Sequence, residues 1–150
     1  MYPNQSRHRV IAGGVIVLFF VAPLLAQLKT LDRNLEPVII SGGVFPDFVG
    51  AAISPSANEL FLYAWRTEIK AWEQIPFQFD EKNSAGKYFN PNVDEVSGLD
   101  DNDELAFMAK DAGDRGLGTW LEDGTSRTFV RYEIKIVDPL DPQKTGWVYL

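Results

Sequence analysis

The segment TFVRYEIKIV, residues 128–137, contains the pattern that decides the fold of this chain. Its apolar positions are Val130, Tyr132, Ile134 and Ile136, and its charged positions between them are Arg131, Glu133 and Lys135. A period of two places successive side chains on opposite faces of a β-strand. One dry face and one wet face are typical of an antiparallel sheet, so we expect the apolar residues to face a core.

Other segments with the composition of strands lie along the chain. Residues 105–109 (LAFMA) predict an interior strand because they are apolar throughout, and residues 146–150 (GWVYL) begin another strand. Residues 75–79 alternate around Pro76, which cannot donate to a ladder, so this strand is expected at a sheet edge or with a bulge. Strands at intervals of about ten residues, separated by turn signals, predict a mainly β chain folded as an antiparallel β-sandwich.

Residues 60–70 form the most aromatic of the predicted strands. One of its faces would carry Phe61, Tyr63, Trp65, Thr67 and Ile69. We expect Tyr63 and Trp65 to belong to the core, and a hairpin to join this strand to the one that follows Ala71. Trp72 and Trp120 have polar neighbours and are better candidates for exposed rings that could stack on sugars.

The first 26 residues have the composition of a targeting segment. Arg7 and Arg9 precede seventeen uncharged residues, Val10–Ala26, and Ala26 is small enough to precede a cleavage site. This is the order of a signal peptide. The alternative is an uncleaved hydrophobic helix over residues 10–28, close to the length of about 20 residues that spans a bilayer, with the arginines held inside. Both interpretations place the rest of the chain outside the cytoplasm, either secreted or periplasmic, or anchored to the membrane.

These patterns divide the chain into three parts. Residues 1–26 are the signal peptide or membrane anchor, residues 27–58 a linker and edge segment, and residues 59–150 the β-sandwich domain. Leucines at 28, 31 and 35 predict a short helix in the linker. Because the sequence stops within the strand-like run GWVYL, without a polar tail, we expect an incomplete sandwich, the N-terminal part of a longer protein.

The composition excludes several kinds of site. The chain has no cysteine, and its only histidine, His8, lies in the targeting segment. Serine–histidine triads and His- or Cys-ligated zinc and haem are therefore excluded from the remainder, which favours a binding or structural role over an enzyme. Beyond residue 26, 12 basic residues face 21 acidic ones, a net charge of −9. So acidic a surface disfavours nucleic acid as a partner.

The acidic segment 80–104 is the one candidate for a metal site. It holds eight carboxylates and two lysines, and hard oxygen ligands suit Ca²⁺. Asn90, Asn92 and Asp94 occupy alternate positions, as ligands do in a calcium loop, and Asp101 is at the twelfth position counted from Asn90, although Glu95 stands where such loops have glycine. A tight turn at residues 98–103 is a second alternative, and its candidate ligands are Asp100, Asp101 and Asp103. A solvated loop held by Asx hydrogen bonds remains the simpler interpretation.

Two motifs carry a resemblance. The runs IPFQFDE at residues 75–81 and GLDDNDELAFMAKD at residues 98–111 resemble a group of exported bacterial and archaeal β-rich proteins, in which an IPFQxDE strand precedes an LDDNDELxFMAKD strand and a GWVYL strand. The resemblance covers roughly residues 60–150. It implies a longer, extracytoplasmic protein and brings no established activity.

The expected function is therefore a binding or structural role for an extracytoplasmic β-domain, with calcium as a candidate stabiliser of the acidic segment. Two alternatives stay open. The first is a carbohydrate-binding or carbohydrate-active module, using exposed tryptophans or a pair of carboxylates. The second is an accessory subunit of a membrane-bound redox complex, as similar β-sandwich modules are, although the exported part lacks the histidine that haem ligation would require. The expected partner of the chain is a protein or a glycan. If residues 10–28 are not cleaved, they would also contact the membrane.

Overall fold

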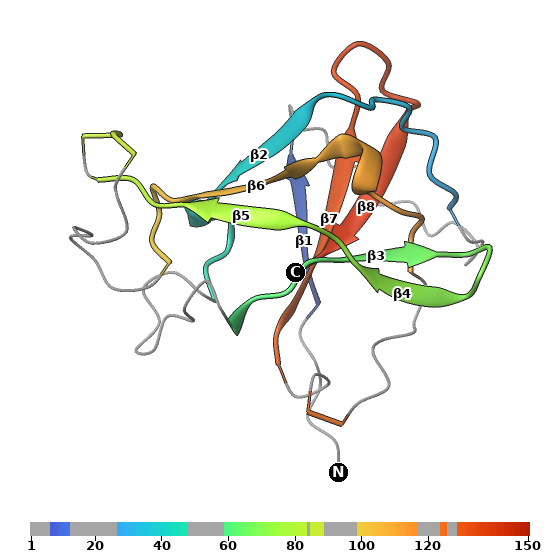
Figure 1. Ribbon diagram of the computed structural model, residues 1–150, viewed down its shortest axis with the longest axis horizontal. Helices are drawn as coiled ribbons and strands as arrows, with labels where there is room; N and C mark the ends of the chain where they lie inside the picture. The colour runs from blue at the N-terminus through green and yellow to red at the C-terminus, as the bar shows by residue number, and fades with distance from the viewer. Residues whose placement is uncertain are drawn as a thin grey trace.

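The computed structural model describes residues 7–12, 27–47, 59–83, 85–88, 99–116, 124–125 and 129–150. Its strands form two sheets that enclose one core (Figure 1). The strands are β1 (Arg7–Ala12), β2 (Pro37–Ser41), β3 (Tyr63–Arg66), β4 (Ala71–Gln74), β5 (Phe77–Asp80), β6 (Glu104–Met108), β7 (Arg131–Val137) and β8 (Thr145–Tyr149). Two short 3-10 turns, η1 (Gly42–Val44) and η3 (Ala109–Asp111), follow β2 and β6. The prediction of a mainly β sandwich is confirmed.

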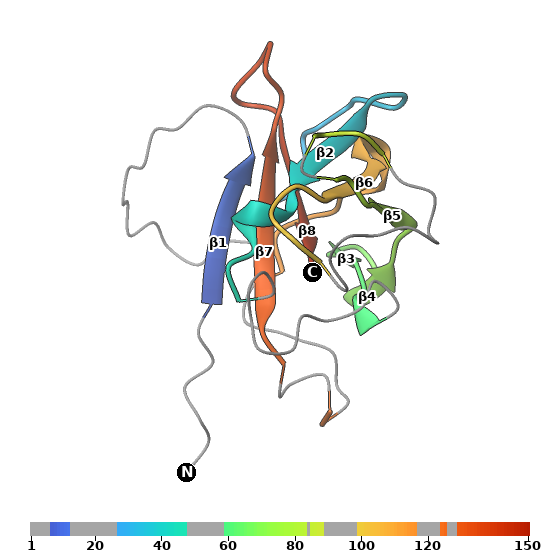
Figure 2. The same ribbon diagram turned by 90° about the vertical axis from the view of Figure 1, so that its left-hand side faces the viewer.

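The larger sheet has the strand order β1-β7-β8-β3-β4 and the smaller sheet β2-β6-β5. All pairs are antiparallel except β1 with β7, which is parallel. Figure 2 shows β1 as the outer strand of the larger sheet, beside β7. Strand β6, predicted as interior, lies at the centre of its sheet, and β5, predicted as an edge strand because of Pro76, lies at the edge. Both predictions are confirmed.

The core receives side chains from both sheets. Its members in the larger sheet are Ala64, Tyr132, Ile134, Ile136 and Val148, and those in the smaller sheet are Ile40, Leu105 and Phe107. Strand β7 follows the predicted alternation from Arg131 onward, because Tyr132, Ile134 and Ile136 are buried. The predicted inward orientation of Val130 is wrong, since this residue precedes the strand and is 37% exposed.

The aromatic segment folds differently from the expectation. Instead of one strand over residues 60–70, a turn at residues 67–70 separates β3 from β4, and Lys70 adopts a positive φ of 51° there. The hairpin pairs Trp65 with Trp72. Residue 69 thus lies in the turn, where Ile69 is 67% exposed.

The buried face of this segment is also the opposite of the predicted one. Leu60, Leu62 and Ala64 are buried, whereas Phe61 is 50% exposed and Tyr63 is half-buried. Both faces of residues 60–65 are apolar, so the alternation alone does not show which face is buried. In the structure, the aliphatic face packs in the core. Because the side-chain period of a strand is two, a one-residue change of phase exchanges the faces completely.

The segment expected as a linker helix is extended and belongs to the sandwich. Thr30 and Leu31 donate their backbone N–H groups to the carbonyl of Thr145, at 2.8 and 3.0 Å. Only Leu31 of the three spaced leucines is buried, while Leu28 and Leu35 are exposed. Pairing with the start of β8 therefore satisfies the backbone in place of a helix, and residues 27–47 are part of the domain rather than a linker to it.

The targeting segment is described only in part. Residues 10–12, which begin the expected hydrophobic helix, lie in strand β1, and the remaining residues of that segment, 13–26, lie outside the described residues. Within the described ranges, the structure has no helix of the length and hydrophobicity that crossing a membrane requires.

The buried face of β7 can be tested with two isoleucines. Ile134 is fully buried on β7, whereas Ile39 on β2 is 55% exposed. Ile134→Ala should lower the free energy of unfolding by about 2–5 kcal/mol, because it leaves a cavity. Ile39→Ala removes the same atoms from the surface and should cost less than about 1 kcal/mol. Urea denaturation measures both, and equal losses would contradict the assignment of faces.

Candidate functional site

The acidic turn at residues 99–103 directly precedes β6 and contacts the backbone that follows β5 and the backbone that follows β2. Asp103 is buried, and its two carboxylate oxygens accept hydrogen bonds from the backbone N–H groups of Lys82 and Asp100, at 3.1 and 2.9 Å. The carboxylate of Asp100 accepts from the N–H of Asn102 at 2.9 Å. These carboxylates therefore act as Asx-type caps of the turn backbone.

The same turn receives the segment that follows β2. The backbone N–H of Gly42 donates to the carbonyl of Asp103 at 2.7 Å, and the hydroxyl of Ser41 donates to the carbonyl of Asp101 at 2.7 Å. A Cβ atom on Gly42 would lie 2.0 Å from the Asp100 carbonyl oxygen, so only glycine fits this approach. The turn therefore connects the segments that follow β2 and β5, the two outer strands of the smaller sheet.

The structure brings together only half of the predicted calcium ligands. Asp100, Asp101 and Asp103 lie in this turn, whereas Asn90, Asn92 and Asp94 lie outside the described residues. Among the residues that the structure describes, no group of three or more acidic or histidine side chains is arranged to hold a metal ion. Calcium binding by residues 90–103 stays a prediction.

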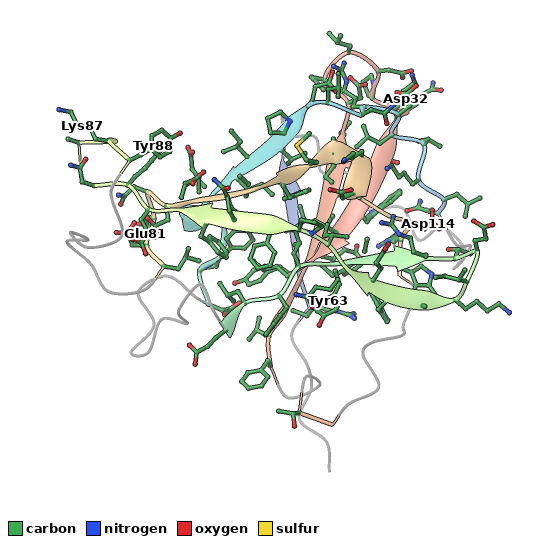
Figure 3. All side chains as sticks on the ribbon, in the orientation of Figure 1. Asp32, Tyr63, Glu81, Lys87, Tyr88 and Asp114 are labelled. Atoms are coloured by element: carbon green, nitrogen blue, oxygen red, sulfur yellow. The ribbon has the colours of Figure 1, made fainter. Side chains whose placement is uncertain are left out.

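Near this turn, Glu104 has two partners. It forms an ion pair with Lys82, which lowers the pKa of the Glu104 carboxyl, and it accepts a hydrogen bond from the Tyr88 hydroxyl at 3.0 Å. The ammonium of Lys82 lies 4.7 Å from the centre of the Tyr88 ring. In Figure 3, Tyr88 and Lys87 lie at one end of the molecule, well apart from Asp32.

A shallow and widely open hollow of about 500 Å³ lies at the end of the molecule where Figure 3 labels Asp32. It is formed by the extended segment before β2 and by the turn between β7 and β8. Its lining residues are Asp32, Arg33, Asn34, Leu35, Glu36, Asp138, Leu140, Asp141 and Lys144. Most of these residues are charged, and two are leucines.

A two-pronged ion pair holds the two walls of the hollow together. Nε and Nη2 of Arg33 each donate to one carboxylate oxygen of Asp138, both at 2.8 Å. This fork geometry is the strongest that an arginine offers to a carboxylate. Hydrogen bonds from Arg33 and from the Leu140 backbone N–H lower the pKa of Asp138 from its ordinary 3.8 to about 2. Glu36 accepts a further hydrogen bond from Arg33 at 3.1 Å.

The turn sequence DPLDP explains the shape of the second wall. Asp138 accepts from the Leu140 N–H at 2.8 Å, and Asp141 accepts from the Gln143 N–H at 3.1 Å, so each aspartate caps the backbone that follows it. Prolines after both aspartates restrict the backbone further. Leu140 lies in this turn and is 82% exposed.

The first wall, residues 32–36, also carries an exposed leucine. Leu35 is 85% exposed, and Asp32 accepts a hydrogen bond from the ammonium of Lys144 on the opposite wall at 2.7 Å. The hollow therefore has an exposed leucine on each wall and four carboxylates against two basic groups.

The sequence did not single out this site. Residues 27–36 were interpreted as a linker and residues 138–142 as a rigid turn, and nothing in either segment indicated that Arg33 and Asp138 meet. One usable signal was present, since Leu35 and Leu140 each directly precede an acidic residue, in positions where a solvated loop does not need a leucine.

The tryptophans proposed as a sugar platform lie differently. Trp72 packs in the larger sheet, with its ring centre 4.8 Å from that of Tyr149 and 5.2 Å from that of Trp65. Gly116 covers it closely, because a Cβ there would lie 2.4 Å from the Trp72 ring. Trp120 lies outside the described residues. Trp72 therefore serves packing.

The ion pair across the hollow predicts an acid-dependent loss of stability. Because the pKa of Asp138 is lowered in the folded state, its contribution is complete above pH 3.8 and is lost as the pH falls toward 2. Asp138→Asn should flatten the decline of the melting temperature in this range, and Arg33→Gln should flatten it in the same way. Thermal unfolding over a pH series measures this, and an unchanged slope in both variants would contradict the assignment.

Comparison of the chain with protein-family models, with curated proteins and with solved structures finds no match. The geometry of the described residues is therefore the starting point for function. Among these residues, one surface feature that combines charged and exposed apolar side chains is the hollow between residues 32–36 and 138–144.

Proposed function

We propose that this chain is an extracytoplasmic β-sandwich binding module that docks a basic, partly apolar segment of a partner protein in the hollow between residues 32–36 and 138–144. The observation that carries the proposal is the pair of leucines, Leu35 and Leu140, exposed by 85% and 82% on opposite walls of one charged hollow. Both leucines line the same hollow, and neither belongs to the buried core.

The apolar part of the partner would cover the two leucines. Burying a leucine side chain that is otherwise exposed contributes about 1.5–3 kcal/mol. Only a fraction of that energy appears as affinity, because the partner segment loses conformational freedom on binding. The Arg33–Asp138 pair and the Lys144–Asp32 pair hold the walls in place beforehand, which reduces this cost.

The charges of the hollow select a basic partner. Its lining has four carboxylates, from Asp32, Glu36, Asp138 and Asp141, and two basic groups, from Arg33 and Lys144. The whole chain carries a net charge of −7, so the surroundings reinforce this preference. Complementary charge of this kind raises the rate of association and discriminates against acidic partners.

The location follows from the targeting segment and from the resemblance to exported β-rich proteins. Residues 1–26 would direct the domain across a membrane as a cleaved signal peptide, or hold it there through residues 10–28 as an anchor. Calcium bound by residues 90–103 would stabilise the acidic segment, and a rise in melting temperature on titration with calcium chloride tests that part separately. Trp72 packs against Tyr149, so this residue does not support the sugar-binding alternative.

Synthetic peptides test the proposal. A fluorescent peptide that alternates arginine and leucine should bind the full chain, and a matched peptide with glutamate in place of arginine should not. The double variant Leu35→Ser/Leu140→Ser should weaken binding by at least about tenfold, because two apolar contacts are lost. Fluorescence anisotropy measures both affinities.

The control is Ile69→Ser, which removes another exposed apolar side chain, in this case from the β3–β4 turn. This variant should bind like the unchanged protein. Equal affinity of the double leucine variant and the unchanged protein would contradict the proposal. So would a weakening by Ile69→Ser as large as that by the leucine changes.

A further inference from the structure

Strand β1 covers one edge of β7. It pairs in parallel with β7 over six residues, from Arg7 opposite Arg131 to Ala12 opposite Ile136. Among the strands that the structure describes, β7 is its only neighbour, and Figure 2 shows β1 at the outside of the sheet. Parallel pairing is slightly less stable per residue than antiparallel pairing.

The residues of β1 also belong to the predicted targeting segment. Residues 10–12 lie at the start of the apolar run that the sequence marks as a signal peptide or anchor. An apolar helix that begins at Val10 and strand β1 exclude each other, since both use the same backbone groups. Cleavage after Ala26 would also separate residues 7–12 from the domain. Both cleavage of the targeting segment and its insertion as a helix would remove β1 from the sheet. The edge of β7 would then be exposed.

The backbone hydrogen bonds of β7 show which groups would then be exposed. Tyr132 and Leu150 exchange both of their N–H···O bonds, at 2.8 and 3.1 Å, so Tyr132 directs its backbone groups toward β8. Because the direction alternates along a strand, Glu133 and Lys135 direct theirs toward β1. An uncovered row of such groups is a template for another strand.

We infer that, once β1 has left, the edge of β7 pairs antiparallel with β7 of a second copy of this chain, with Ile134 at the two-fold axis. This register pairs all seven residues of β7, from Arg131 opposite Val137 to Val137 opposite Arg131. It also brings together residues whose backbone groups face the edge, namely Glu133 and Lys135. The proposal is independent of the hollow at Asp32.

Charge complementarity selects this register and this partner. Glu133 of each copy lies opposite Lys135 of the other, so the two-fold axis generates two pairs of opposite charge. A shift by two residues in one direction would place Glu133 opposite Glu133, and Arg131 opposite Lys135. The neighbours on the same face keep both side chains in position, because Glu133 is ion-paired with Arg115 at 3.1 Å and Lys135 lies over the Trp147 ring.

The apolar face of β7 is also continuous in the paired arrangement. Tyr132, Ile134 and Ile136 are buried in each sandwich and would lie on the same side of a sheet that runs through both copies. The isologous contact closes on itself, since the same edge is used by both copies. The pairing would therefore end at a dimer.

The test uses the full chain with a protease site inserted after Ala26. Before cleavage, β1 covers β7 and the protein should be a monomer by sedimentation equilibrium. After cleavage and removal of the released residues 1–26 it should dimerise, and an excess of a synthetic peptide of residues 5–14 should return it to monomer by competing for the edge. A cleaved protein that stays monomeric would overturn the proposal.

Lys135→Glu tests the register in the cleaved protein. This change places the new carboxylate opposite Glu133 of the other copy, twice in each dimer, and should raise the dissociation constant by about tenfold or more. The matched control is Arg131→Glu, which makes the same change of charge on the same face but lies opposite Val137, and it should have a much smaller effect. Circular dichroism verifies that both variants fold. Equal effects of the two changes, or none, would overturn the proposal.

Because the chain contains no cysteine, a disulfide provides a second readout. The double variant Glu133→Cys/Lys135→Cys should form a covalent dimer on oxidation after cleavage, and Lys135→Cys alone should not. A covalent dimer of the single variant, or none with the double variant, would contradict the register. The variant Leu35→Ser/Leu140→Ser should dimerise normally, which separates this result from that of the peptide experiment.

Discussion

The fold depends on the burial of one face of β7. Tyr132, Ile134 and Ile136 enter the core that both sheets share, and β7 is the neighbour of β8 in the larger sheet. The hydroxyl of Tyr132 extends this role, because it donates to the Asp47 carboxylate at 2.7 Å and accepts from the Asp47 N–H at 2.9 Å. Burial raises the pKa of this tyrosine, which therefore remains a neutral donor. The segment after β2 is thus tied to the larger sheet.

The C-terminal end and the outer edge of β7 define the rest of the surface. At its C-terminal end, Asp138 continues directly into the turn that forms one wall of the hollow, and its fork with Arg33 fixes the other wall. Along the edge that faces β1, Glu133 and Lys135 present backbone groups to whichever strand lies there. A single well-buried strand therefore positions both of the surfaces that we propose as interaction sites.

The sequence predicts the parts of this fold in which one side of a strand is clearly more polar than the other, or in which composition is decisive. Strands β6, β7 and β8 and the edge position of β5 follow from alternation, apolar content and Pro76. The phase of β3 could not be predicted, because Leu62 and Tyr63 are both suited to a core and only tertiary packing chooses between them. The hollow could not be predicted either, since Arg33 and Asp138 are 105 residues apart and neither lies in a recognisable motif.

Amide hydrogen exchange, followed by NMR, tests the dependence of the fold on β7 most directly. If β7 is the strand on which both sheets depend, the amides of Tyr132 and Leu150, which bond to each other's carbonyls, should exchange only through global unfolding. The amide of Lys70, in the exposed β3–β4 turn, should exchange through local opening and much faster. Exchange of Tyr132 as fast as that of Lys70 would contradict the account.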